Sequence, residues 1–262
     1  MPIESLRSSH VLPDIPPSML PAADFIAVRD EVNRLAGLLR DVFDDAADTD
    51  ETPPDVLVDA LTDAIDAVQQ QSGAGQGDTD PSVNRHIARL CDHGIDLLAR
   101  LSAQALRLGH GDLAADWERL TLPYACCAAR HGGEVGHLEP VANAAANLAD
   151  RLDDPHELET LHGMLDEIVQ AASPRVSEAP PASEAGRAWR VLILDRAIVA
   201  QRTRQPTLMQ KAFDALVEQI PDAAPDFFRE GMAQMQASDY PAPVQDLMRR
   251  YYETWSQPRQ LH

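Results

Sequence analysis

The chain has 262 residues and a formal net charge of −20, from 42 acidic and 22 basic side chains. This charge disfavours nucleic acid and anionic lipid as partners, because both are bound through positive charge that displaces counterions. No apolar run approaches the ~20 residues needed to cross a bilayer. The N-terminus lacks the apolar core of a signal peptide. We therefore expect a cytoplasmic protein with no membrane segment.

The N-terminal third is predicted to be an extended arm followed by a helical hairpin. Residues 1–20 are rich in proline and show no apolar period, which predicts the arm. Over residues 21–70, apolar side chains recur at steps of three and four on either side of Pro53-Pro54, which predicts two helices. The second of these carries an outer stripe of acids: Asp55, Asp59, Asp63 and Asp66. Residues 71–82, rich in Gln, Gly and Asp, are predicted to be a linker.

Residues 83–173 are predicted to form a central domain of four helices. The first of them, residues 84–109, has the longest apolar pattern in the chain and ends in a glycine-containing turn. Pro123 is expected to kink or interrupt the second helix. The fourth has the clearest start signal, because Asp154 is suited to the N-cap and Pro155 to the first helical position.

The C-terminal part is predicted to be a second linker, residues 174–183, followed by a helical domain at 184–257. This domain contains four helical patterns separated by prolines: 184–204, 207–220, 224–237 and 243–256. No alternating strand pattern competes with them. We expect an all-α fold of about ten helices in stacked antiparallel hairpins, either an α-solenoid or an irregular helical bundle.

Residues 187–256 resemble a tetratricopeptide repeat. Positions where that family favours a small residue, an aromatic residue and a closing proline are occupied here by Ala197, Phe213 and Pro221. The aromatic residue and glycine that open such a repeat have the spacing of Phe227 and Gly231. The pattern departs from the family where it has Arg196 in place of a packing leucine and Pro243 in place of a small residue. The resemblance implies a curved scaffold that binds a partner protein.

Residues suited to chemistry are present but do not form a recognisable catalytic motif. HExxH, GxSxG, P-loop and GxGxxG sequences are all missing from the chain. The sequence lacks a CxxC motif, and the adjacent Cys126 and Cys127 are predicted to be small buried helix residues. Two Glu-x-x-His pairs suit the metal sites of helical-bundle enzymes, so a metal site formed by these four residues is an alternative: Glu134, His137, Glu159 and His162.

Aromatic and arginine side chains gather near the C-terminus, in a chain that otherwise contains few aromatic residues. Such side chains are enriched at the energetic centres of protein interfaces. Adjacent residues on a helix cannot both point inward, so one member of each aromatic pair should be exposed. Leu247 and Trp255 are expected to face the core. The predicted partner-binding surface consists of Phe228, Arg229, Arg249, Arg250 and Tyr252.

The sequence thus favours a non-enzymatic scaffold, adaptor or assembly factor that binds another protein without a cofactor. The partner is expected to be another protein, and the net charge favours a basic one through long-range attraction to positive charge. One alternative is the metal-dependent enzyme described above. Another is an acidic protein that imitates nucleic acid and occupies a basic partner, which the acidic stripe at residues 55–66 would favour.

Overall fold

The computed structural model describes residues 20–46, 52–72, 81–237 and 240–256. Most of the predicted arm and most of the 71–82 linker lie outside these residues. Helices account for nearly all of the described chain, which contains no β-strand, so the predicted all-α fold is confirmed. The helices are α1 (Phe25–Asp45), α2 (Pro54–Ser72), α3 (Pro81–Arg107), α4 (Gly111–Arg119), α5 (Thr121–Arg130), α6 (Leu138–Arg151), α7 (Pro155–Ala171), α8 (Pro174–Ser177), α9 (Glu184–Arg202), α10 (Pro206–Gln219), α11 (Ala224–Ala237) and α12 (Ala242–Trp255).

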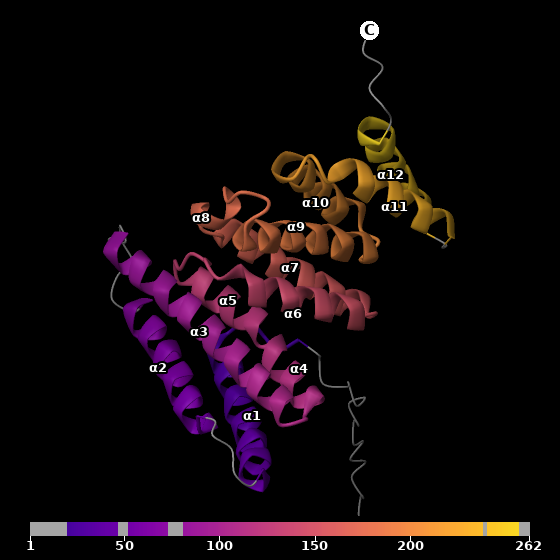
Figure 1. Cartoon of the computed structure of the whole chain (residues 1–262). Coiled ribbons are helices and arrows are strands. Elements are labelled where there is room, and N and C mark those ends of the chain that lie inside the picture. Colours follow the sequence, from indigo (N-terminus) through magenta and orange to yellow (C-terminus); the bar gives the residue numbers. More distant parts are fainter. Residues whose placement is uncertain (1–19, 47–51, 73–80, 238–239, 257–262) are drawn as a thin grey trace, which may run out of the picture.

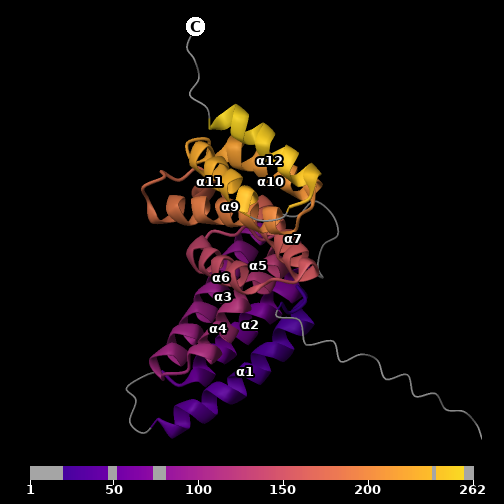
Figure 2. The same ribbon diagram turned by 90° about the vertical axis from the view of Figure 1, so that its right-hand side faces the viewer.

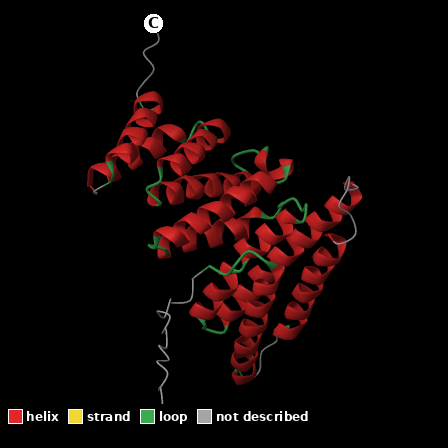
Figure 3. Cartoon of the chain, turned by 180° about the vertical axis from the view of Figure 1, so that it is seen from behind, coloured by secondary structure: helices red, strands yellow, loops and turns green. Residues whose placement is uncertain are grey.

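The helices stack roughly in chain order along one elongated molecule (Figures 1 and 2). Helices α1 to α4 form one end, α5 to α7 form the middle, and α9 to α12 form the other end. Successive helices pack against each other as antiparallel hairpins, as in the α2–α3, α9–α10 and α11–α12 pairs. Seen from behind, the same stack consists of helices joined by short loops (Figure 3). The arrangement places α12 at the end of the stack, with one side free of neighbouring described helices.

One hydrophobic core runs through the whole stack, from Leu20 to Met248. Helix α9 joins the middle to the C-terminal end, because it packs against α6, α7 and α10. The segment predicted as a linker at residues 174–183 contains the short helix α8, whose Val176 is buried against this core. Helix packing is therefore continuous across the boundary suggested by composition.

Local sequence signals explain two of the helix boundaries. The carboxylate of Asp154 accepts hydrogen bonds from the backbone N–H groups of His156 and Glu157 at 2.9 and 3.1 Å, so this residue is the N-cap of α7, as predicted. The expected interruption near Pro123 is also present, because the chain divides into α4 and α5 at Leu120. Pro123 lies in the first turn of α5, where its missing N–H leaves no helical hydrogen bond unmade.

Candidate functional site

An aromatic cluster holds the last three helices together. The ring of Phe213 on α10 lies with its centroid 5.2 Å from those of Phe228 on α11 and Tyr251 on α12. The rings of Phe228 and Tyr251 stack on each other at 5.1 Å. Helices α11 and α12 approach closely at Gly231, where an added Cβ atom would lie 2.7 Å from Met248 Cε. The rings thus fix the position of α12 on α10 and α11.

The prediction that Phe228 is exposed is wrong. Its side chain is fully buried, and Phe227 is the partly exposed member of the pair. The reason is the rotation of α11 about its axis, which directs Phe228 between Phe213 and Tyr251. The two adjacent residues do differ in exposure, but their adjacency does not determine which of them faces inward.

The arginines of the predicted surface are exposed, and they differ in their partners. Arg229 forms an ion pair with Asp226, one turn earlier on α11. Arg249 forms one with Asp246 on α12, at 2.8 Å. Arg250 is exposed and has no ion pair within the part of the chain that the structure describes. Its guanidinium group is therefore the one in this set whose charge is available to a partner.

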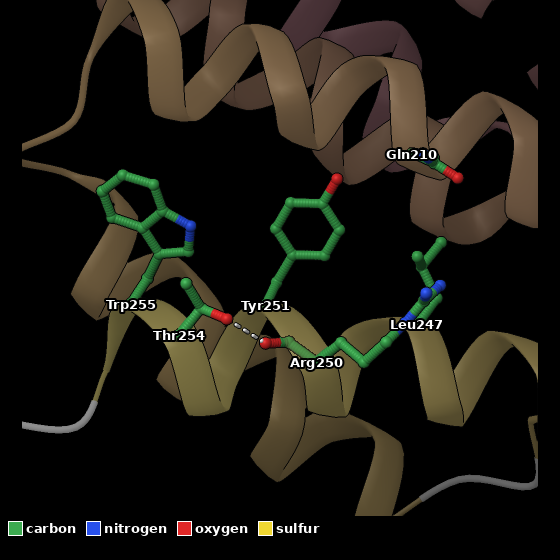
Figure 4. Close-up of a pocket in the computed structure, with 6 residues that line it drawn as sticks. All are labelled: Gln210, Leu247, Arg250, Tyr251, Thr254 and Trp255. Carbon is green, nitrogen blue, oxygen red and sulfur yellow. Dashed lines mark hydrogen bonds between the residues drawn. The ribbon is translucent and has the colours of Figure 1, made fainter.

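Arg250 lies at the edge of a surface pocket of about 210 Å³ between α10 and α12. Figure 4 shows the side chains of Tyr251 and Trp255 on α12 beside this pocket, with Gln210 on α10 opposite them. Leu247, which is buried as predicted, forms part of the apolar lining. Trp255 is only half-buried, so it is less enclosed than its predicted core position implies. The pocket combines apolar walls with one cation that has no ion pair to any described residue.

Polar contacts fix the side chains around the pocket. The hydroxyl group of Tyr251 donates a hydrogen bond to the carboxylate of Asp214 on α10. Burial, reinforced by this hydrogen bond, raises the pKa of Tyr251 well above its usual value. The Thr254 hydroxyl donates to the carbonyl oxygen of Arg250 at 2.7 Å, as drawn in Figure 4. At the end of α12, the Ser256 hydroxyl donates to the carbonyl oxygen of Pro225 at 2.8 Å. These contacts preorganise the surface.

Tyr252, the remaining member of the predicted surface, is half-buried and packs against the core edge. The structure therefore brings Arg250 together with side chains that the sequence did not assign to a site. These are Gln210, Leu247, Tyr251, Thr254 and Trp255. The spacing of 247, 250, 251, 254 and 255 on a helix is the signal that places them on one face.

The two Glu-x-x-His pairs are not brought together. Glu134 lies in the loop before α6 and His137 is the N-cap residue of that helix, so this pair does not share a helical face. On α7, Glu159 is exposed whereas His162 is 3% exposed. The two side chains of the second pair therefore lie in different environments, one in solvent and one in the core. Within the described ranges, no three His, Cys, Asp or Glu side chains are grouped so as to hold a metal ion. The geometry therefore gives the metal alternative no support.

A buried charged cluster between α7 and α9 was not found from the sequence. Arg196 is 5% exposed and forms an ion pair with Asp166 at 2.5 Å. Burial, reinforced by the positive charge of Arg196, lowers the pKa of His162 to about 4. His162 is therefore neutral at physiological pH. These contacts explain how an arginine is accommodated where the repeat pattern favours leucine.

The cysteines are free and buried, as expected for Cys126 and Cys127. Burial raises the pKa of Cys127 to about 12 and those of Cys91 and Cys126 still higher. Thiols with such values are protonated at neutral pH and are poor nucleophiles. The three buried cysteines are therefore suited to packing between helices α3 and α5.

The acidic stripe on α2 is partly neutralised by α1. Asp55 forms an ion pair with Arg40, and Asp66 forms one with Arg29. Only Asp59 and Asp63 of the stripe are exposed without such a partner among the described residues. The paired charges make this face a less regular array of negative charge than the sequence suggests.

None of the described helices combines the length and the apolar character that a membrane span requires. Comparison of the chain with protein-family models, curated proteins and solved structures gives no match.

Proposed function

We propose that this chain is a non-enzymatic cytoplasmic adaptor whose α10–α12 surface binds another protein, as the tetratricopeptide-like pattern implies. The observation that carries the proposal is the position of Arg250, an exposed arginine that has no ion pair among the described residues and lines one pocket with the half-buried rings of Tyr251 and Trp255. Arginine, tyrosine and tryptophan are the residues most enriched among interface hot spots.

The size of the pocket favours a protein partner over a cofactor. Small-molecule sites usually enclose about 300 Å³ or more, whereas this pocket measures about 210 Å³ and is open to solvent. A pocket of this kind suits a single apolar side chain of a partner. Arg250 at its edge suits a carboxylate or a backbone carbonyl group beside that side chain.

The end of the helical stack supplies the surrounding surface. A stacked helix leaves one side uncovered unless a further element packs on it. Helix α12 packs on α10 and α11 but has no later described helix to cover its outer side. The half-buried Tyr252 and Trp255 lie on this helix. A partner that packs there would bury apolar surface already held in place by the aromatic cluster.

The experiment compares two neighbouring arginines. Immobilised wild-type chain, Arg250→Ala and Arg249→Ala are used to capture proteins from host extract, and the bound proteins are quantified by mass spectrometry. A partner held by the proposed surface is retained by Arg249→Ala, because that arginine is paired with Asp246. It is lost by Arg250→Ala, since truncating a hot-spot side chain commonly costs about 2 kcal/mol or more. Equal retention by both variants would place the interaction elsewhere.

A further inference from the structure

A second surface lies in the middle of the stack, where α6 and α9 pack side by side. The two helices run in the same direction, because Glu139 and Glu184 at their N-terminal ends line one cavity and Arg202 at the end of α9 bonds to the carbonyl oxygen of Ala149 near the end of α6. Between them is a groove with a cavity of about 170 Å³, lined at one end by Glu139 and Glu184. The exposed residues of α9 form a narrow strip on one side of this helix, and the first three of them line the cavity: Glu184, Arg187, Val191 and Ile198. This face is distinct from the α10–α12 pocket.

Glu139 and Glu184 line the cavity, and Asp150 and Asp195 lie three turns farther along the same two helices. At one end, a hydrogen bond between the side chains of Glu139 and Glu184 raises the pKa of Glu139. At the other end, burial raises the pKa of Asp195 to about 7, and the negative charge of Asp150 adds to this shift. The two pairs are 11 residues apart on each helix, which corresponds to about 16 Å along the axis.

Apolar side chains lie between these ends, beside Asn143 and Arg187. Val191 is 40% exposed and Ile198 is 41% exposed, which makes them two of the few large apolar side chains at the surface of the described chain. Ala142 and Ala188 line the floor. Small residues at these positions let a partner's side chains approach the two helix backbones.

The positive charges near the groove do not neutralise the negative charge of its carboxyl groups. Arg187 lines the groove and donates a hydrogen bond to the carbonyl oxygen of Ala182. Arg202 lies at the C-terminal end of α6, where it bonds to the carbonyl oxygens of Ala149 and Leu152 and to Asp153. The electrostatic effects of His137 and Arg187 lower the pKa of Glu139 and so partly offset the increase caused by Glu184. Two carboxyl groups, those of Glu139 and Glu184, thus line the cavity alongside Arg187, and those of Asp150 and Asp195 lie farther along the same helices.

We propose that the α6–α9 groove binds a basic amphipathic helix of a partner protein, with one basic side chain at each carboxyl pair and apolar side chains over Val191 and Ile198. Like charges held close together across two helices are unfavourable, and a cation between them relieves the repulsion. The net charge of the chain attracts the same class of partner over a distance.

The spacing selects a helix over an extended segment. Residues 11 apart on a helix lie on nearly the same face, about three turns from each other, so both basic side chains reach their carboxyl pairs. An extended segment covers the same ~16 Å in about five residues, and side chains five apart point to opposite sides.

Two synthetic peptides test the proposal by fluorescence anisotropy with the full chain. Both are labelled alanine- and leucine-based helices of identical composition, and the first carries two arginines about three turns apart on its leucine face. The second carries the same arginines on opposite faces. We expect the first to bind about tenfold more tightly than the second. Equal binding of the two peptides, or no measurable binding of the first, overturns the proposal.

Matched charge variants locate the binding site. Glu139→Gln/Glu184→Gln should weaken binding of the first peptide about fivefold or more, because one cation contact is lost. Asp59→Asn/Asp63→Asn on α2 removes the same number of exposed charges and should change binding less than about twofold. An equal loss in both variants would show attraction to net charge alone and would contradict the groove.

A third variant tests the apolar part of the groove. Val191→Ser/Ile198→Ser changes two exposed side chains, so the melting temperature should stay close to that of the wild type. Affinity for the first peptide should fall about fivefold, because apolar contact area is lost. Unchanged affinity in this variant would contradict the proposed placement of the helix. The outcome at the α10–α12 surface does not affect any of these three measurements.

Discussion

The hydroxyl group of Tyr251 on α12 donates a hydrogen bond to the carboxylate of Asp214 on α10. This contact joins two helices that are separated in the chain by α11, and it lies beside the stacked rings of Phe228 and Tyr251. The end of the stack is therefore fixed by an aromatic contact inside and a polar contact at its edge. The rigidity of the proposed binding surface depends on both.

Removal of the Tyr251 hydroxyl group should weaken this end of the stack. Folding raises the pKa of Tyr251, so its contribution is fully present below the pKa of the unfolded chain and is lost as pH rises through the folded value. Tyr251→Phe should cost about 1 kcal/mol of unfolding free energy at neutral pH. Tyrosinate absorbance, followed as pH increases, should lose one late-titrating group in the variant. An unchanged titration would contradict the assignment.

Truncation of Phe228 should lower the stability of the protein much more than truncation of Arg250. Phe228 is fully buried among aromatic rings, so Phe228→Ala should cost about 3–5 kcal/mol of stability. Arg250 is exposed without an ion pair in the described chain, so Arg250→Ala should change stability by about 0.5 kcal/mol or less. Urea denaturation measures both values. Similar losses in the two variants would mean that Arg250 is part of the core.

Replacement of Asp195 should stabilise the protein at alkaline pH. Its pKa rises from 3.8 to about 7 on folding, so between these values the folded state holds a proton that the unfolded state has lost. Stability therefore falls as pH increases through this window, by at most about 4 kcal/mol. Asp195→Asn stays neutral and should unfold at higher urea concentration than the wild type at pH above ~7. Asp63→Asn, at an exposed position, is the control.

Loss of the partner of a buried arginine should be costly. Asp166→Ala leaves the charge of Arg196 buried and unpaired, which commonly costs ~3–5 kcal/mol; the lower end applies because the Asp166 side chain is 33% exposed. Asp226→Ala, which removes the partner of the exposed Arg229, should cost less than about 1 kcal/mol. Thermal melting compares the two. Equal losses would indicate that Arg196 reaches solvent when its partner is removed.

The apolar period of the sequence was sufficient to predict most of the helices, because each helix must bury one face against its neighbours. It did not reveal α8, a single turn whose one buried side chain, Val176, is too little for a periodic pattern. It also left the division at Leu120 approximate. Helix boundaries depend on the hydrogen bonds of individual backbone groups. An apolar period extends over many residues and therefore does not locate the terminal residue.

The candidate surfaces were only partly predictable. The sequence located the C-terminal aromatic and arginine residues, but the inward position of Phe228 depends on contacts with Phe213 and Tyr251 from two other helices. The α6–α9 groove depends on a register between helices that are 45 residues apart, as Glu139 and Glu184 show. No local pattern encodes such a register. Only the packed structure brings these residues together.

The position of α9 also matters while the chain is being synthesised. The ribosome releases α6 and α7 before α9, yet α9 covers both of them in the finished protein. Until Trp189, Leu192 and Ile193 have emerged, the apolar sides of α6 and α7 remain in contact with water or with a chaperone. A nascent chain halted before residue 184 would therefore be more prone to aggregation than the finished protein.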